Sequence, residues 1–220
     1  MCIRDSFEHI QKICHQHDIL FIADEVITGF GRTGEWFASQ TMGLQPDMMT
    51  LAKGLTSGYV PMSAVMIGDR VAGRLIADGG EFYHGFTYSG HPVAAAVALA
   101  NLDLIEREGL IGRVRTDTGP YLAQALAPLA SHRLVGEVRT FGMLAAIELV
   151  KSKDGPEMFE DSGTVGVICR DHAIANGLMM RAVRDAMILS PALTFGREDI
   201  DATVRMATAA LDATADQLGL

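Results

Sequence analysis

The sequence is poor in cysteine, in positive charge and in long apolar runs, and each shortage excludes a class of protein. Its 220 residues include three cysteines, too few for a disulfide framework, which favours a reducing compartment such as the cytoplasm. Its 18 basic and 27 acidic residues give a net charge of −9, which argues against nucleic acid or an anionic membrane surface as the main partner. The longest apolar run, residues 93–100, is far shorter than the ~20 residues of a membrane-spanning helix.

The amino terminus also lacks the basic and apolar regions of a signal peptide. Residues 1–6 (MCIRDS) resemble translated adapter sequence, and we expect them to be foreign to the protein. The sequence has no internal repeat. Its 49% hydrophobic and 20% charged residues are ordinary for a folded globular protein rather than a disordered one.

Three apolar runs predict the strands of an α/β sheet. Residues 19–23, 48–52 and 63–67 are largely apolar without alternation, which is typical of strands buried on both faces. Asp24 follows the first run and Lys53 follows the second. Ligands of such sheets bind beyond the carboxyl ends of the strands. These two polar residues are therefore the first candidates for a site.

The second half of the chain predicts a smaller α+β domain. Residues 91–108 should form a helix, because Pro92 lies in its first turn and Gly109 follows its end. We expect a domain boundary there, with domains at residues 1–108 and 109–220. Further helices are expected at residues 110–129 (interrupted near 119–120), 163–176 and 198–218, and strands at residues 142–150 and 187–189.

Lys53 and Asp24 suggest carbonyl chemistry. Lys53 directly follows an apolar strand, where partial desolvation would lower the pKa of its amine and leave it neutral for Schiff-base formation. Asp24 ends the preceding strand. A pyridoxal phosphate site needs such a pair, because the lysine takes the cofactor aldehyde and the carboxylate keeps the pyridine nitrogen protonated. A structural ion pair between the two is the alternative.

Two other patterns indicate a dinucleotide site and a metal site, but only weakly. Residues 29–34 match the dinucleotide-binding pattern G-x-G-x-x-G, but no clear helix signal follows, and the pattern alone is not specific. Cys14, His15 and His17 could suggest a metal site. The spacing of the apolar Phe7, Ile10 and Ile13 predicts a helix over residues 7–17. Residues one and two apart on a helix do not share a face, so we expect no metal there.

Several motifs, in order and at suitable spacing, resemble the signature of class III pyridoxal-phosphate aminotransferases. The resemblance extends over almost the whole chain after Ser6, and it is to the ω-aminotransferase branch that uses amines and pyruvate. It implies an α/β fold, in which part of a fold-type I large domain with a mostly parallel sheet precedes an α+β small domain. The motifs are residues 20–26 (LFIADEV), 29–34 (GFGRTG), Asp47, 52–54 (AKG), 58–61 (GYVP), 84–92 (HGFTYSGHP) and 177–181 (GLMMR), followed by Pro191.

The resemblance assigns cofactor roles to individual positions. Lys53 matches the lysine that forms the Schiff base with pyridoxal 5′-phosphate, and Asp24 matches the aspartate on its pyridine nitrogen. Val26 matches the apolar residue that packs on one face of the ring. Thr87, with Phe86 beside it, matches the threonine that reaches the cofactor phosphate of the neighbouring subunit. A homodimer with shared active sites is therefore implied.

The resemblance also implies the substrates. Arg181 matches the mobile arginine that pairs with a substrate carboxylate, whereas Arg184 is expected on the surface. Glu25 resembles a carboxylate that holds the site residues in place without contacting the cofactor itself. The implied reaction moves an amino group from an amine or ω-amino acid to a keto acid such as pyruvate. An aminomutase or decarboxylase of the same fold is the alternative.

One expected part of the family pattern is missing from the sequence. No phosphate-cradling glycine and serine loop, and no aromatic residue to stack on the second ring face, precedes Asp24. Pro191 is followed by Ala192 where family members commonly have a second proline, which affects only the local loop. We therefore expect the chain to be a C-terminal fragment that binds cofactor poorly and lacks turnover by itself.

Overall fold

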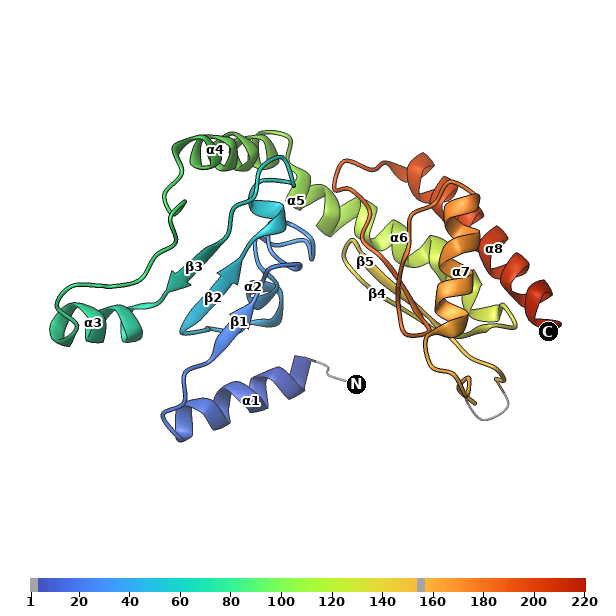
Figure 1. The fold of residues 1–220 in the computed structure, drawn as a ribbon, viewed down its shortest axis with the longest axis horizontal. Coiled ribbons are helices and arrows are strands. Elements are labelled where there is room, and N and C mark those ends of the chain that lie inside the picture. Colours follow the sequence, from blue (N-terminus) through green and yellow to red (C-terminus); the bar gives the residue numbers. More distant parts are fainter. Residues whose placement is uncertain (1–3, 154–156) are drawn as a thin grey trace. The chain divides into compact units, whose positions relative to one another are not determined.

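The computed structural model describes residues 4–153 and 157–220. Residues 1–3 of the segment expected to be foreign lie outside the described residues. The chain divides into two compact units, unit 1 (Met1–Gly112) and unit 2 (Arg113–Leu220), and Figure 1 labels those of their elements for which there is room. No described helix is long and apolar enough to cross a membrane.

Unit 1 is built on a three-stranded sheet in the order β1 (Ile22–Asp24), β2 (Met48–Leu51), β3 (Ala64–Ile67). β1 and β2 run parallel, with Asp24 opposite Thr50, whereas β3 runs antiparallel to β2. The three strands lie side by side in Figure 1. Because β1 and β2 are parallel, their carboxyl ends lie at the same edge of the sheet.

Within the described residues, these strands are not buried on both faces as the sequence predicts. Ile22 on β1 is 53% exposed, and Val65 on β3 is 54% exposed. The described helices of unit 1 include α1 (Arg4–Gln16), α3 (Asp69–Asp78) and α4 (Pro92–Arg107), and none of them packs broadly on either face of the sheet. The described residues therefore leave parts of these strands uncovered.

Helix α4 confirms the helix predicted at residues 91–108. Pro92 occupies its first position, and the side chain of His91 accepts a hydrogen bond from the N–H of Ala94 at 3.4 Å. Gly109 follows the helix with a φ of +61°, a conformation that glycine adopts without steric cost. The two termini thus have the residues that their geometry requires.

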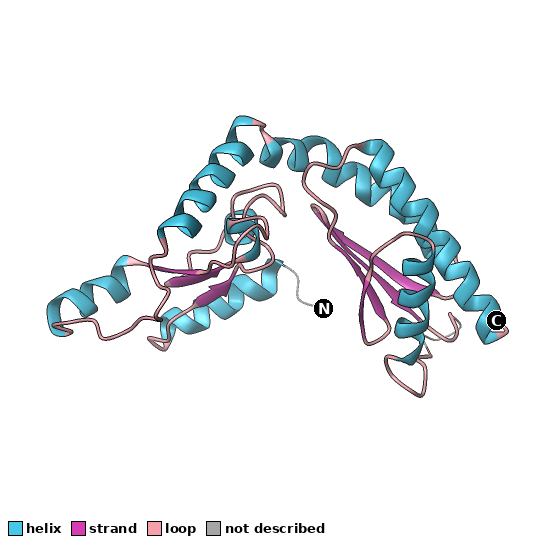
Figure 2. Cartoon of the chain, turned by 45° about the horizontal axis from the view of Figure 1, so that its top comes forward, coloured by secondary structure: helices cyan, strands magenta, loops and turns pink. Residues whose placement is uncertain are grey.

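Unit 2 is an antiparallel sheet packed against helices, as Figure 2 shows. Alternate residues of β5, namely Ala145, Ile147 and Leu149, are buried, so one face of the sheet contributes to the core. The strand order is β4 (Val135–Phe141), β5 (Leu144–Leu149), β7 (Ala186–Leu189), β6 (Arg181–Val183), and the packed helices are α6 (Gly119–Leu126), α7 (Thr164–Ala175) and α8 (Arg197–Leu218).

The helical segment predicted at residues 110–129 is interrupted as expected. It comprises α5 (Leu110–Arg113), a π-helical turn (Val114–Thr118), α6 and a 3₁₀ turn (Ala127–Ser131). A Cβ atom on Gly119 would lie 2.5 Å from the carbonyl oxygen of Val114. Only glycine fits where the π-helical turn meets α6.

The carboxylate of Asp47 joins the start of β2 to the chain before β1. Its Oδ2 accepts a hydrogen bond from the N–H of Phe21 at 2.8 Å, and Nη1 of Arg70 donates to the same oxygen at 3.2 Å. The hydrogen bond from Phe21, assisted by the charge of Arg70, holds the pKa of Asp47 below its ordinary value of 3.8. The folded state therefore gains stability from Asp47 only while its side chain is ionised.

This hydrogen bonding predicts an acid-sensitive contribution to the stability of unit 1. Because the folded-state pKa is depressed, the contribution is complete above pH 3.8 and is lost as the pH falls through the folded-state pKa. We expect Asp47→Asn to lower the thermal midpoint at neutral pH and to flatten its decline below pH ~4. The exposed Asp103→Asn on α4 is the control. A decline that Asp47→Asn leaves unchanged would contradict this account.

Candidate active site

Asp24 is the last residue of β1, and its carboxylate is only partly used by the chain. Oδ1 accepts hydrogen bonds from the N–H of Val26 at 3.1 Å and from Oγ1 of Thr50 at 3.0 Å. Among the described residues, Oδ2 accepts none, and the side chain is exposed. One carboxylate oxygen is therefore fixed in place and the other is available to a ligand.

Lys53 opens the short 3₁₀ turn (Lys53–Leu55) that follows β2. Its φ is +37°, an uncommon conformation for a residue with a side chain and one that costs about 1–3 kcal/mol. Strain of this kind concentrates at functional sites. Within the described residues Lys53 is exposed, so its predicted desolvation stays a prediction for the whole protein.

The parallel pairing of β1 and β2 places Asp24 and Lys53 at one edge of the sheet. No ion pair joins them within the described part of the chain, and both residues are exposed. The alternative of a buried structural ion pair is therefore wrong. Among the described residues, a carboxylate with one unengaged oxygen and an amine without a partner thus lie at one edge, which fits the two polar contacts that a pyridoxal ring requires.

Glu25 is a buried carboxylate that organises the loop after β1. It is 2% exposed and accepts hydrogen bonds from Oγ1 of Thr28 at 2.5 Å, from the N–H of Ala38 at 3.0 Å and from the N–H of Ser39 at 2.6 Å. Ala38 and Ser39 begin α2 (Ala38–Met42), so the charge lies at a helix amino terminus, where anions are stabilised. By fixing this loop, Glu25 helps to hold its neighbours Asp24 and Val26 in place.

Replacing Glu25 by glutamine should destabilise unit 1. The glutamine amide keeps the shape but presents an NH₂ group to one of the backbone N–H donors, which leaves that donor unpaired in a buried position. We expect a loss of about 1–3 kcal/mol in the free energy of unfolding, measured by denaturant titration. Glu106→Gln on α4 makes the same chemical change at an exposed position and should change the stability little. Equal stability of the two variants would contradict the role of Glu25.

Asn101 on α4 holds the turn that contains Lys53. Its Nδ2 donates to the carbonyl oxygens of Gly54 at 2.8 Å and Leu55 at 3.1 Å, and its Oδ1 accepts from Oγ of Ser57 at 2.7 Å. Sequence reasoning missed this residue, because an asparagine inside an apolar helix carries no local signal of a partner 47 residues away.

The glycine-rich loop does not have the geometry of a dinucleotide site. In that motif the third glycine opens a helix whose amino terminus binds the pyrophosphate. Here the chain after Gly34 stays non-helical until α2 begins at Ala38. A Cβ atom on Gly54 would lie 3.0 Å from the ring of Phe30. The loop therefore packs Phe30 against the turn that contains Lys53.

Phe86 and Thr87 lie in an exposed segment between α3 and α4. Phe86 is 78% exposed, and its N–H and carbonyl oxygen both bond to Ser89 at 2.9 Å. Thr87 is also exposed. Among the described residues, nothing brings either side chain into contact with Lys53 or Asp24.

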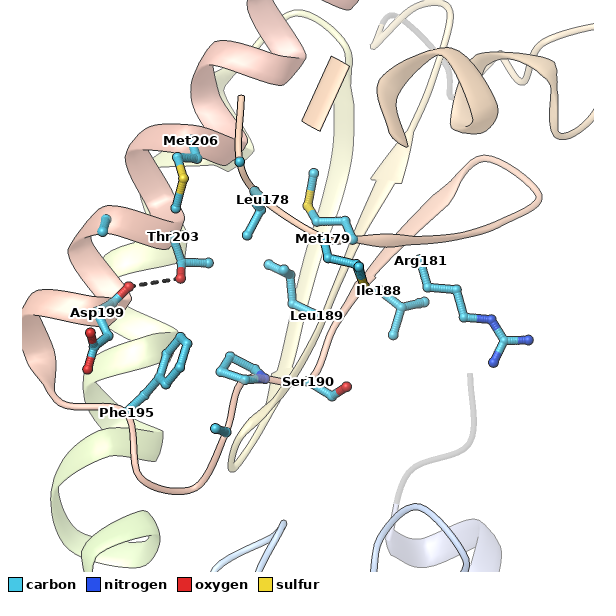
Figure 3. A pocket seen from close by; sticks show the side chains of 15 residues that line it. Leu178, Met179, Arg181, Ile188, Leu189, Ser190, Phe195, Asp199, Thr203 and Met206 are labelled. Carbon is cyan, nitrogen blue, oxygen red and sulfur yellow. Dashed lines mark hydrogen bonds between the residues drawn. The ribbon is translucent and has the colours of Figure 1, made fainter. Parts of the chain in front are cut away.

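Arg181 begins β6 at the rim of a groove of about 620 Å³ in unit 2. Figure 3 shows its guanidinium directed away from the apolar side chains of the groove. Arg181 is exposed, and the described residues offer it no ion pair. The groove itself is mainly apolar and is lined by Leu178, Ile188, Pro191, Phe195, Thr203 and Met206 among others.

A lysine and a carboxylate at one sheet edge would fit the Schiff base and the ring-nitrogen partner that pyridoxal phosphate needs, and the comparisons with known proteins indicate a family with this chemistry. The family model described as aminotransferase class-III matches residues 3–211. The chain therefore belongs to the class III aminotransferases. The family uses pyridoxal 5′-phosphate, and the expected fold class, part of a fold-type I transferase, is confirmed.

Individual relatives share this assignment. The chain is 55% identical over 206 residues to the putrescine–pyruvate aminotransferase of Pseudomonas aeruginosa, which covers 94% of the chain and 45% of the relative. It is 42% identical to the diaminobutyrate–2-oxoglutarate transaminase of Halomonas elongata, over 96% of the chain and 46% of the relative. The structure of the ω-transaminase of Pseudomonas jessenii with PMP matches with a TM-score of 0.91 and 42% identity, over 98% of the chain and 48% of that structure. The chain thus spans about half the length of the relatives it matches.

Proposed function

We propose that the whole protein moves an amino group from an amine or ω-amino acid to a keto acid, with pyruvate as the acceptor. This proposal rests on one observation: at one edge of the sheet, a carboxylate oxygen of Asp24 and the amine of Lys53 have no partner among the described residues. The similarity to a putrescine–pyruvate aminotransferase supports a diamine as donor and pyruvate as acceptor. The scarcity of cysteine supports a cytoplasmic location.

Lys53 and Asp24 have separate tasks in this reaction. Nζ of Lys53 removes the proton from the substrate carbon that bears nitrogen, and later returns a proton during the exchange. Oδ2 of Asp24 holds the proton on the ring nitrogen of the cofactor, while Val26 packs on the ring. When bound, pyridoxal phosphate supplies an electron-withdrawing ring that stabilises the charge left by proton removal. In the same proposal Thr87, next to Phe86, binds the cofactor phosphate.

Arg181 holds the carboxylate of the keto acid. A guanidinium donates two parallel hydrogen bonds to a carboxylate, and Arg181 is exposed and not engaged by a described acid. The site must accept an amine without a carboxylate in one half of the reaction and a keto acid in the other. An arginine at the start of a short edge strand is compatible with both substrates. Its exposed side chain can bind the carboxylate of the keto acid and turn away when the amine is bound.

The proposed active assembly is a homodimer. Helix α3 and the segment after it, which contains Thr87, expose large apolar side chains that a second copy would cover, since soluble proteins rarely leave such patches open. The side chains in question are Ile76 (84% exposed), Phe82 (65%), Tyr83 (87%), Phe86 (78%) and Tyr88 (81%). A second copy seated there would bring the two Thr87 segments to the interface, in line with a phosphate contact across subunits.

The direct test is a donor and acceptor panel with the whole protein. Putrescine and an ω-amino acid are each offered with pyruvate or 2-oxoglutarate, and product amino acids are quantified. We expect alanine from pyruvate in amounts equal to the amine consumed. Release of carbon dioxide or rearranged amine without amino transfer would instead support a decarboxylase or an aminomutase.

A further inference from the structure

The turn between β6 and β7 is fastened to the amino terminus of α7 by Asp185. This residue is 3% exposed. Its Oδ2 accepts a hydrogen bond from the N–H of Gly163 at 2.8 Å, and its Oδ1 accepts one from the N–H of Gly166 at 2.9 Å. Helix amino termini leave such N–H groups unpaired, and Gly163 at the cap position has no side chain to satisfy them. Asp185 supplies the missing cap from a distant part of the chain.

The turn and the helix also approach each other closely. A Cβ atom on Gly166 would lie 2.0 Å from the carbonyl oxygen of Arg184, so any larger residue would push the turn away from α7. Arg184 has a φ of +53°, in the left-handed region that favours glycine. A strained turn of this kind persists only where its surroundings hold it, and here the surroundings are Asp185 and Gly166.

The position of this turn governs that of Arg181. β6 is an edge strand of three residues, and among the described strands it pairs with β7 alone, with Val183 opposite Ala186 and Arg181 opposite Ile188. A slip of one residue in such a hairpin would turn every side chain of β6 to the other face. The strand is too short to fix its own register, so the turn must do so.

We propose that Asp185 is a positioning residue for the keto acid, because it holds the β6–β7 hairpin in the register that presents Arg181 to the substrate carboxylate. This rests on the role of Arg181 given under the proposed function. Asp185 touches neither substrate nor cofactor. It acts through two backbone hydrogen bonds and the contact of the turn with Gly166.

Two variants test the proposal in the whole protein by different routes. Asp185→Asn keeps one acceptor oxygen but presents NH₂ to a backbone N–H, and Gly166→Ala keeps the carboxylate but displaces Arg184. Each should raise KM for pyruvate roughly tenfold or more, since small displacements of a positioning group have large effects. The kcat and the KM for a carboxylate-free amine should stay within about twofold. Leu126→Val, fully buried on α6, which packs on β4 at the opposite edge of the sheet from β6, is the control for lowered stability alone and should leave all three constants unchanged.

A double-variant cycle with Arg181→Gln separates the proposal from its premise. If Asp185 acts through Arg181, Asp185→Asn adds nothing to KM for pyruvate once Arg181 is replaced. Two results would overturn the proposal. One is a double variant in which the two increases in KM for pyruvate add, and the other is an Asp185→Asn variant whose kinetics with the amine suffer as much as those with pyruvate. If Arg181→Gln alone leaves KM for pyruvate unchanged, the role of Arg181 fails and this proposal fails with it. If Arg181→Gln raises KM but Asp185→Asn and Gly166→Ala do not, only the role of Asp185 is refuted.

Discussion

Replacing Lys53 by alanine is expected to lower the rate of transamination at least about 10³-fold, because proton transfer and nucleophilic attack by Nζ are both lost. Lys53→Arg should be nearly as inactive, since a guanidinium stays charged and cannot act as a base. Initial rates of alanine formation by the whole protein measure the effect.

The control for Lys53 is Lys12→Ala, which removes an exposed lysine on α1. It should leave the rate within about twofold of the parent, as surface substitutions usually do. Thermal midpoints of all the variants show whether the protein is still folded. A Lys53→Ala protein that is folded and retains a tenth or more of the parent rate would remove Lys53 from the mechanism.

Replacing Arg181 by glutamine is expected to act on one half of the reaction. A hydrogen-bonded charge pair is worth about 1.5–3 kcal/mol, so KM for pyruvate should rise roughly 10- to 100-fold. The half-reaction with a carboxylate-free amine should change little, because that substrate offers the guanidinium no partner. Steady-state kinetics with the keto acid and single-turnover kinetics with the amine separate the two halves.

Arg184→Gln is the matched control for Arg181. It makes the same change three residues away on an exposed side chain. Like arginine, glutamine has a side chain, so the substitution does not relax the backbone of the turn as glycine would. We expect KM for pyruvate to stay near the parent value. If instead Arg184→Gln gave the larger effect, Arg184 and not Arg181 would bind the carboxylate, and the register of β6 would not determine the binding of the keto acid.

The sequence predicted those parts of the fold that depend on local signals. α4 could be bounded from Pro92 and Gly109, because each residue fits only one end of a helix. Asp24 and Lys53 could be found because polar residues at the ends of apolar strands stand out. Strand burial could not be predicted, because it depends on elements that pack over the strands rather than on the strands themselves.

The supporting residues could not be predicted for a physical reason. Glu25, Asn101 and Asp185 bind backbone groups 14, 47 and 22 residues away, and no local pattern records such partners. The resemblance pointed to Glu25 alone. β6 was also missed, since three residues are too few to show the period-two pattern of a strand.

The central claim is that the cofactor is bound covalently through Lys53. The whole protein is incubated with pyridoxal phosphate, reduced with borohydride, digested, and mapped by mass spectrometry. The chain offers four lysines. Of these, Lys151 pairs with Glu157 and Lys153 donates to the carbonyl oxygen of Ala130. We predict one reduced pyridoxyl group, on Lys53, at one per chain. Modification spread over Lys12, Lys151 and Lys153 with Lys53 unmodified would contradict the claim.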